Sequence, residues 1–175
     1  MLFFIPQNSL PAIAPGLTVH IEFRERAERR DDNDFFASLN DNRATLFTRG
    51  RVGLAYDAGE GTTLRAVYQY DNAQTMPTVG GDSQATRQDL VEANLQHRSR
   101  GSIFTVGRQK TSKGGQRLIG ALEWANSSRS WLGARLQAGG WDMFYGELES
   151  NPVPNPDVKL AYASYDGPLG ESLVA

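Results

Sequence analysis

Arginine side chains recur at alternate positions along several segments of this 175-residue chain. A guanidinium group stays charged at any physiological pH, and its planar fork of donors matches the geometry of a carboxylate. Several such groups on neighbouring strands would form a basic ladder able to bind or pass acidic solutes. The basic residues on the polar faces of alternating segments are Arg24, Arg49, Arg51, Arg65, Arg135 and Lys159.

The same polar faces carry acidic residues, which leaves a second interpretation open. Glu22 and Glu92 share faces with arginines, whereas Glu147 lies in a segment with apolar residues on both faces. If these acids and bases pair with each other, they would stiffen the structure without contacting a solute. The formal net charge of only −2 gives no reason to expect a nucleic-acid partner.

Other reactive residue types do not form a recognisable site in the sequence. His20 and His97 have no partner at metal-ligand spacing, so we predict no metal and no cofactor. The acidic stretch 31–34 lacks the calcium-loop pattern, and the Gly-rich stretch 113–116 lacks phosphate-loop spacing. No Gly-x-Ser-x-Gly motif is present, and we predict that the protein is not an enzyme.

The segments that would position the arginines are alternating runs of roughly ten residues, bounded by Gly, Pro, Asn or Asp. In the first run, Leu17, Val19, Ile21 and Phe23 share one face, and the polar residues share the other. This period of two is typical of β-strands. We predict eight strands, within residues 17–26, 44–57, 62–71, 89–97, 102–109, 131–138, 141–149 and 157–165, and the start of a ninth at 172–175.

Short connections between these runs alternate with long ones, such as 72–87 and 110–130. Outer-membrane β-barrels have this layout, and their strands need only every second residue to be apolar. No stretch approaches the roughly 20 apolar residues of a membrane-spanning helix. The fold class we predict is all-β, an antiparallel transmembrane β-barrel. A soluble antiparallel β-domain also alternates and remains an alternative.

Aromatic residues cluster near the ends of the runs, where interfacial girdles of a membrane barrel would lie. Ordinary strand propensity would explain the same placement. The residues concerned are Tyr56, Tyr68, Tyr70, Trp131, Trp141, Tyr145, Tyr162 and Tyr165.

The most specific motif lies between Val106 and Arg135. Gly-Arg-Gln at 107–109 leads through a Gly-rich loop to Arg-Leu-Ile-Gly at 117–120, and Trp-Ala-Asn at 124–126 precedes Gly-Ala-Arg at 133–135. This pattern resembles the alginate export family of outer-membrane porins. Leu132 departs from it, because the family usually carries Asp there, and the local charge arrangement is altered.

The resemblance implies a barrel of about eighteen strands. This chain would supply about eight of them as a single partial domain over 1–175, with 1–16 leading into the first strand. The N-terminus does not form an intact secretion signal, and we expect the chain to be a piece of the larger barrel. The resemblance also implies that Arg108, Arg117 and Arg129 lie around a loop that folds into the interior. Arg108 has the parity of its run's apolar residues, so we expect it beyond the membrane edge or beside a bulge.

The function predicted from these observations is that of a bacterial outer-membrane porin. It would pass anionic oligosaccharides of the alginate type, or small acidic solutes, by passive diffusion. Its partners would be outer-membrane lipid, the solute and periplasmic export components. The alternative is a small closed structural or adhesive barrel without a pore. The residues predicted to line the interior and bind solute are Arg24, Arg49, Arg51, Arg65, Arg108, Arg129, Arg135 and Lys159.

Overall fold

The computed structural model describes residues 2–4, 8–30, 43–77, 83–115, 117, 119–150 and 155–167, which lie in strands, turns and loops. Two short strands come first, β1 (Leu2–Phe4) and β2 (Asn8–Ala14). The eight predicted strands are confirmed as β3 (Leu17–Arg30), β4 (Arg43–Gly59), β5 (Thr62–Pro77), β6 (Ser83–Ser99), β7 (Ser102–Gln109), β8 (Ser130–Ala138), β9 (Trp141–Ser150) and β10 (Asn155–Tyr165). The ninth strand predicted at 172–175 lies outside the described residues.

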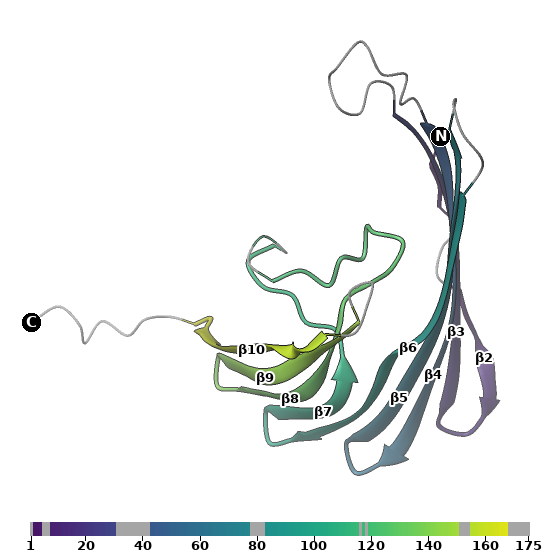
Figure 1. Ribbon diagram of the computed structural model, residues 1–175. Helices are drawn as coiled ribbons and strands as arrows, with labels where there is room; N and C mark the ends of the chain where they lie inside the picture. The colour runs from purple at the N-terminus through teal and green to yellow at the C-terminus, as the bar shows by residue number, and fades with distance from the viewer. Residues whose placement is uncertain are drawn as a thin grey trace, which may run out of the picture.

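The strands form one antiparallel sheet in which β3 to β10 pair in chain order. β1 and β2 both pair with β3, so the segment expected to lead into the first strand adds strands to this edge. Pro11 lies where the β2–β3 register shifts, which suits an edge strand that needs no N–H group there. The sheet curves strongly (Figure 1). Within the described residues it is open, because β10 pairs with β9 alone.

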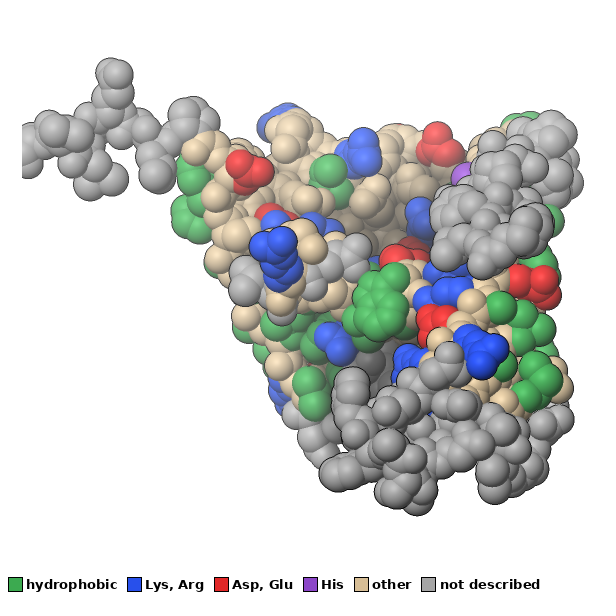
Figure 2. All heavy atoms as spheres, turned by 90° about the horizontal axis from the view of Figure 1, so that it is seen from above, with side chains coloured by type: hydrophobic (Ala, Val, Ile, Leu, Met, Phe, Trp, Pro, Cys, Tyr) green, Lys and Arg blue, Asp and Glu red, His purple; other side chains and the backbone are tan. Residues whose placement is uncertain are grey.

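Apolar and polar side chains separate onto the two faces of this curved sheet. Ile21 and Val52 are opposite each other on the outward face and are 46% and 47% exposed, whereas Arg49 and Arg51 on the concave face are almost fully buried. A soluble domain buries its apolar side chains, so this distribution is inverted. In Figure 2 charged side chains gather toward the inside of the curve, with hydrophobic ones along the rim. Among the described residues no helix is long and apolar enough to cross a membrane.

The strands in the first half of the sheet are longer than predicted. β3 to β6 have 14 to 17 residues, whereas β7 to β10 have 8 to 11. We predicted a loop over 72–87, but β5 and β6 continue to pair as far as Thr75 and Ser83. The added residues carry mostly small or polar side chains on both faces, so no alternation marks them as strand.

Six of the eight aromatic residues near the run ends are exposed on the outward face. Trp131 and Tyr162 are the exceptions, because they face the concave side. There Trp131 packs edge-on against Phe144, and Tyr162 stacks on the same ring with centroids 5.6 Å apart. Buried Leu148 and partly buried Leu160 complete this group, which we call the aromatic cluster. It gives β8 to β10 apolar side chains on both faces.

Candidate functional site

The segment 110–129, which joins β7 to β8, folds back over the concave face instead of extending away from the sheet (Figure 1). We call it the inner loop. Its own backbone bonds give it a shape: Lys113 and Ile119 form a bridge, and Arg129 donates its N–H to the Ala121 carbonyl at 2.8 Å. Leu122 has a φ of 54°, a left-handed conformation that turns the chain just before its contacts with β3 and β4.

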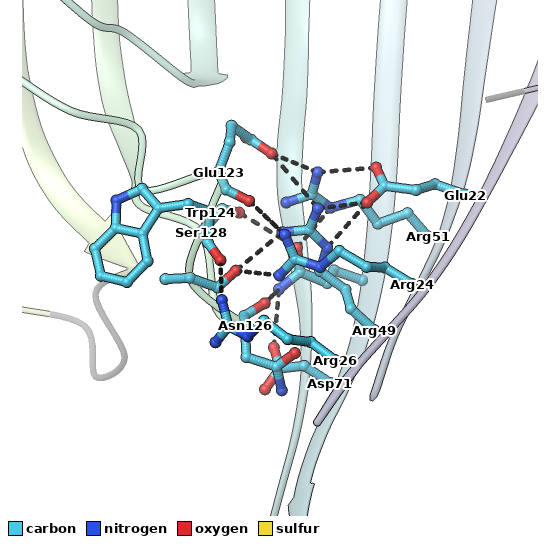
Figure 3. Close-up of polar contacts among 12 residues, drawn as sticks. Glu22, Arg24, Arg26, Arg49, Arg51, Asp71, Glu123, Trp124, Asn126 and Ser128 are labelled. Atoms are coloured by element: carbon cyan, nitrogen blue, oxygen red, sulfur yellow. Dashed lines mark hydrogen bonds and ion pairs between the residues drawn. The ribbon is translucent and has the colours of Figure 1, made fainter. Parts of the chain in front are cut away.

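Arginines on β3 and β4 bind three successive carbonyl groups of the inner loop, Glu123–Ala125 (Figure 3). Arg24 donates to the first and third carbonyl oxygens at 2.8 and 2.5 Å, and Arg49 donates to the same two at 3.0 and 3.1 Å. Arg26 donates to the middle carbonyl oxygen at 2.7 Å. Backbone carbonyls held away from water need such partners, so these bonds fix the loop to the wall.

Arg24 and Arg49 lie directly opposite each other on the paired strands. Two like charges in this position would normally destabilise the pair of strands. Here both guanidinium groups share the same two carbonyl oxygens, and Arg49 also donates to Glu22 with its Nε at 3.0 Å. The partial negative charge of the carbonyls and the carboxylate of Glu22 offset the repulsion. The loop and the two arginines therefore stabilise each other.

Arg51 binds the inner loop through a carboxylate instead of a carbonyl. Its Nη1 lies 2.6 Å from Glu123 and 3.1 Å from Glu22, while Lys110 Nζ lies 2.8 Å from the other oxygen of Glu123. Burial acts to raise the pKa of Glu123, but Lys110 and Arg51 outweigh it and lower the pKa to about 2. Glu123 is therefore ionised at neutral pH. We refer to the four wall arginines together as the arginine clamp: Arg24, Arg26, Arg49 and Arg51.

A second set of contacts continues from the clamp onto β5. Gln69 is 1% exposed and donates to Asp71 at 2.8 Å and to the Asn126 carbonyl oxygen at 3.4 Å. Ser127 donates to Asp71 at 3.0 Å, and Ser128 donates to Gln69 at 3.3 Å. Six successive loop residues, 123–128, thus contact the concave face through polar groups.

The beginning of the inner loop rests on the other end of the sheet. The Thr111 hydroxyl lies 2.8 Å from that of Tyr162, and Lys113 Nζ lies 5.5 Å from the centroid of the same ring. Lys113 also pairs with Asp142. The carboxylate of Asp142 accepts two hydrogen bonds from Arg135, from Nε at 2.8 Å and from Nη2 at 2.7 Å. The loop therefore bridges two regions of the concave face that are distant in sequence.

Two further predicted cations also have acidic partners. Arg65 lies 3.0 Å from Glu92. Arg108 donates to Asp89 at 2.8 Å and to the Ser130 hydroxyl at 3.1 Å. The acid–base pairing considered from the sequence is thus present throughout the described part of the wall.

The placement of Arg108 follows from a bulge, one of the two options that the sequence left open. Val91 has no partner where the β5–β6 register shifts, and Gly107 has a φ of 113°. A side chain at Gly107 would meet the carbonyl oxygen of Ala93 at 2.4 Å, so glycine is required for this close approach. On the two neighbouring strands, the residues opposite Arg108 are Ala93 and the outward-facing Leu132. The irregularity nevertheless lets the side chain of Arg108 reach Asp89.

In the described part of the chain no hydrogen bond or ion pair joins the clamp to Arg117, Arg129 or Lys159. Arg117 is exposed, and Arg129 is half-buried at the end of the inner loop. Lys159 is opposite Glu147 on the outward side, 3.3 Å away, contrary to the interior placement we expected. The reason is the aromatic cluster, which occupies the inner face of β10 with Leu160 and Tyr162 and leaves Lys159 the other face.

Sequence reasoning missed several charged residues of the site, among them Lys110, Glu123 and Arg26. Lys110 and Glu123 lie in the inner loop, where no periodicity indicates which way a side chain points. Arg26 was on the polar face of the first run, and its parity with Arg24 was the signal that could have included it. The predicted set also left out backbone carbonyls, which carry no sequence signature.

A cavity of about 220 Å³ lies beside the clamp on the concave face. Its charged and titratable lining consists of His20, Glu22, Arg51, Arg65, Glu92 and Lys110. No group of three potential metal ligands occurs among the described residues, and the lining of this cavity is both basic and acidic.

An open, curved antiparallel sheet with an apolar outer face, a charged inner face and a loop folded against that inner face has the distribution of side chains that is typical of a porin wall. The chain belongs to the alginate export family, whose model matches residues 16–159. Membership implies an outer-membrane export porin, which is a transport protein and not an enzyme. Searches of curated proteins and of solved structures found no match to this chain.

Proposed function

We propose that this chain forms part of the wall of a larger outer-membrane barrel. In it the inner loop and the arginine clamp narrow the interior into a passage for anionic oligosaccharides of the alginate type or small acidic solutes, which cross by passive diffusion. The observation that carries this proposal is the attachment of Glu123–Ala125 to the concave face by Arg24, Arg26 and Arg49. A loop in this position reduces the cross-section at the place where cations are most concentrated.

The charges around the clamp do not cancel. Six basic residues meet there, and the carboxylates that they contact number four, which leaves an excess of two positive charges. Arg24 contributes to this excess because its hydrogen-bond partners in the loop are carbonyls. The basic residues are Arg24, Arg26, Arg49, Arg51, Arg65 and Lys110, and the carboxylates are Glu22, Glu28, Glu92 and Glu123.

This excess of positive charge has its largest effect on solutes inside a narrow passage. Low-dielectric walls focus the field of a charged lining and raise the local concentration of oppositely charged solutes. The cavity of about 220 Å³ beside Arg51 and Lys110 provides space next to these charges. An anion entering it would exchange part of its hydration for the guanidinium and ammonium groups, and the neighbouring Glu22 and Glu92 would keep the attraction weak enough for release.

The outward face supports a lipid environment, and the open sheet supports a larger barrel. Residues such as Phe23, Leu54 and Val106 are each more than 40% exposed on the outward face, where lipid tails would cover them. In a membrane, unpaired backbone groups along a free strand edge cost several kcal/mol each, so β10 would need a further strand beside it.

Reversal potentials of the full protein in planar bilayers under a salt gradient test this proposal. We expect a preference for chloride over potassium, reduced by Arg24→Gln, which removes a charge that has no carboxylate among its loop partners. Lys159→Gln is the matched control, because it removes the same charge from the outward face and should leave the preference unchanged. A cation-selective wild-type channel would overturn the proposal.

A further inference from the structure

Trp124 differs from the other exposed apolar side chains of this protein. It is 67% exposed, more than any other large apolar residue described. Residues such as Ile21, Leu54 and Tyr145 are exposed on the outward face of the sheet. Trp124 lies instead on the inner loop, on the concave side, with its backbone among the polar contacts of the arginine clamp (Figure 3). Lipid that covers the outward face would not cover this indole.

The backbone beneath Trp124 is held more firmly than that of an ordinary loop. Its own carbonyl oxygen accepts from Arg26 at 2.7 Å, and the carbonyls of the two flanking residues each accept from both Arg24 and Arg49. Figure 3 shows the indole projecting away from the arginine clamp. Among the described residues no ring contact or hydrogen bond to this indole occurs.

A rigidly mounted, exposed aromatic ring is an efficient binding surface. The ring loses little conformational freedom when it is covered, because its backbone is already ordered and its side chain has two rotatable bonds. The faces of the ring carry a partial negative charge and attract C–H groups, which carry a partial positive charge. The solute that matches it must combine a flat patch of C–H groups with a polar remainder that tolerates the charged surroundings.

We propose that Trp124 is a stacking platform for the pyranose ring of an acidic saccharide, whose carboxylate is attracted by the neighbouring arginine clamp. A pyranose ring has an apolar C–H face and a rim of hydroxyl groups, so it meets both requirements. The inference rests on the proposed function and deepens it, because it selects saccharides over small acidic solutes that lack such a ring. Trp124 thereby becomes a specificity-determining residue, and the clamp supplies charge selection.

The test uses the full protein in planar bilayers with a uronic-acid trisaccharide and measures how long each molecule blocks the current. Trp124→Leu keeps an apolar side chain but removes the aromatic face, and we expect it to shorten the mean block about three- to tenfold. Trp124→Phe should retain most of the block time. Trp141→Leu, on the outward face, is the matched control and should behave as wild type. Citrate, which has three carboxyl groups and no ring, should not distinguish the variants.

A second measurement keeps the inference testable if Trp124→Leu does not fold. The difference between the fluorescence spectra of wild type and Trp124→Phe isolates Trp124, and the trisaccharide should shift or quench that signal while citrate leaves it unchanged. Equal block times in wild type and Trp124→Leu, or an indole signal that the trisaccharide does not alter, would overturn the stacking role even in an anion-selective channel. A wild-type channel without anion preference would overturn the proposed function itself.

Discussion

The inner loop is attached to the concave face at two places that differ in their chemistry. On β3 to β5 the attachment is polar, with the arginine clamp and Gln69 binding loop residues 123–128. On β8 to β10 it rests on the aromatic cluster, against which Thr111 and Lys113 lie. One loop is thus held at its far end by many arginine hydrogen bonds, and at its base by the Thr111–Tyr162 contact and the Lys113–Asp142 ion pair beside a packed surface.

The two attachments should respond differently to mutation. A hydrogen-bonded ion cluster requires every partner, because removing one leaves a desolvated charge or carbonyl unpaired. A packed aromatic surface loses stability in proportion to the area and volume removed, with little effect on the direction of distant groups. We therefore expect the clamp to determine where the loop tip lies in the interior, and the aromatic cluster to determine how stable the β8–β10 region is.

Arg49→Met gives the largest expected effect. Arg49 is 4% exposed, and its loss leaves Glu22 with Arg51 as its remaining arginine partner and the two loop carbonyls with Arg24. Breaking a buried ion pair from one side costs roughly 3–5 kcal/mol. We expect the loop tip to leave the wall, which single-channel recording would detect as a change in conductance and greater current noise.

Two further variants test whether the effect of Arg49→Met comes from the contacts that Arg49 makes in the clamp. Glu22→Gln combined with Arg49→Met should cost less than the sum of the single changes, because each single change already removes the Glu22–Arg49 ion pair. Arg29→Met, on the outward side of β3, should leave the conductance unchanged. A normal conductance and normal noise in Arg49→Met would show that the clamp does not position the loop.

Phe144→Ala should affect stability with little effect on the conductance. Phe144 is 4% exposed at the centre of the aromatic cluster, and truncating a buried phenylalanine costs about 3–5 kcal/mol. We expect the lower end of this range, because its neighbours Leu160 and Tyr162 are only partly buried and can move. Thermal unfolding of the protein in detergent micelles measures the loss. Met143→Ala, one position along and facing outward, is the control; an equal loss in both variants would deny the cluster a special role.

The titration of Glu123 provides a smaller, reversible way to weaken the clamp. Its pKa is lowered from 4.5 to about 2 in the folded protein, so ionisation contributes stability that is fully present above about pH 4.5. That contribution decreases as the pH falls and is lost as the pH passes below about 2. We expect channel noise to rise as the pH is lowered through this window.

Glu123→Gln separates this carboxylate from the others that titrate at low pH. The variant should show elevated noise already at pH 6 and a smaller further change below pH 4.5. Glu28→Gln, which removes a carboxylate that contacts Arg26 but not the inner loop, should retain the pH response of wild type. A wild-type and a Glu123→Gln channel with the same pH profile would exclude Glu123 as the titrating group.

The two regions of the sheet also differ in how well the sequence predicts which way their side chains face. On β3 to β5 the inner face is polar and the outer face is apolar, so alternation alone assigned Arg24, Arg49, Arg51 and Arg65 to one side. On β8 to β10 both faces carry apolar residues, and the same rule placed Lys159 on the wrong side. Alternation assigns a face only where the two faces differ in polarity.

The hydrogen-bond partners of the arginines could not be predicted from the sequence, for a different reason. The contact between Arg24 and residue 123 joins positions 99 apart in the chain, and its acceptor is a backbone carbonyl. Neither the separation nor the acceptor leaves a pattern in residue types. Family resemblance suggested that the loop folds inward, and periodicity could not, because the loop has none.

Thr111→Val gives the smallest expected effect, and its outcome distinguishes most directly between the two attachments of the inner loop. It keeps the size and branching of the side chain but removes the hydroxyl that lies 2.8 Å from Tyr162. A net contribution of about 0.5–1.5 kcal/mol is typical of one such bond, so thermal unfolding should shift only slightly. If the clamp positions the loop tip and the base does not, as we infer, the conductance and the pH response should match wild type. Current noise comparable to that of Arg49→Met would instead mean that a single directional bond at the base positions the tip, and the distinction between the two attachments would fail.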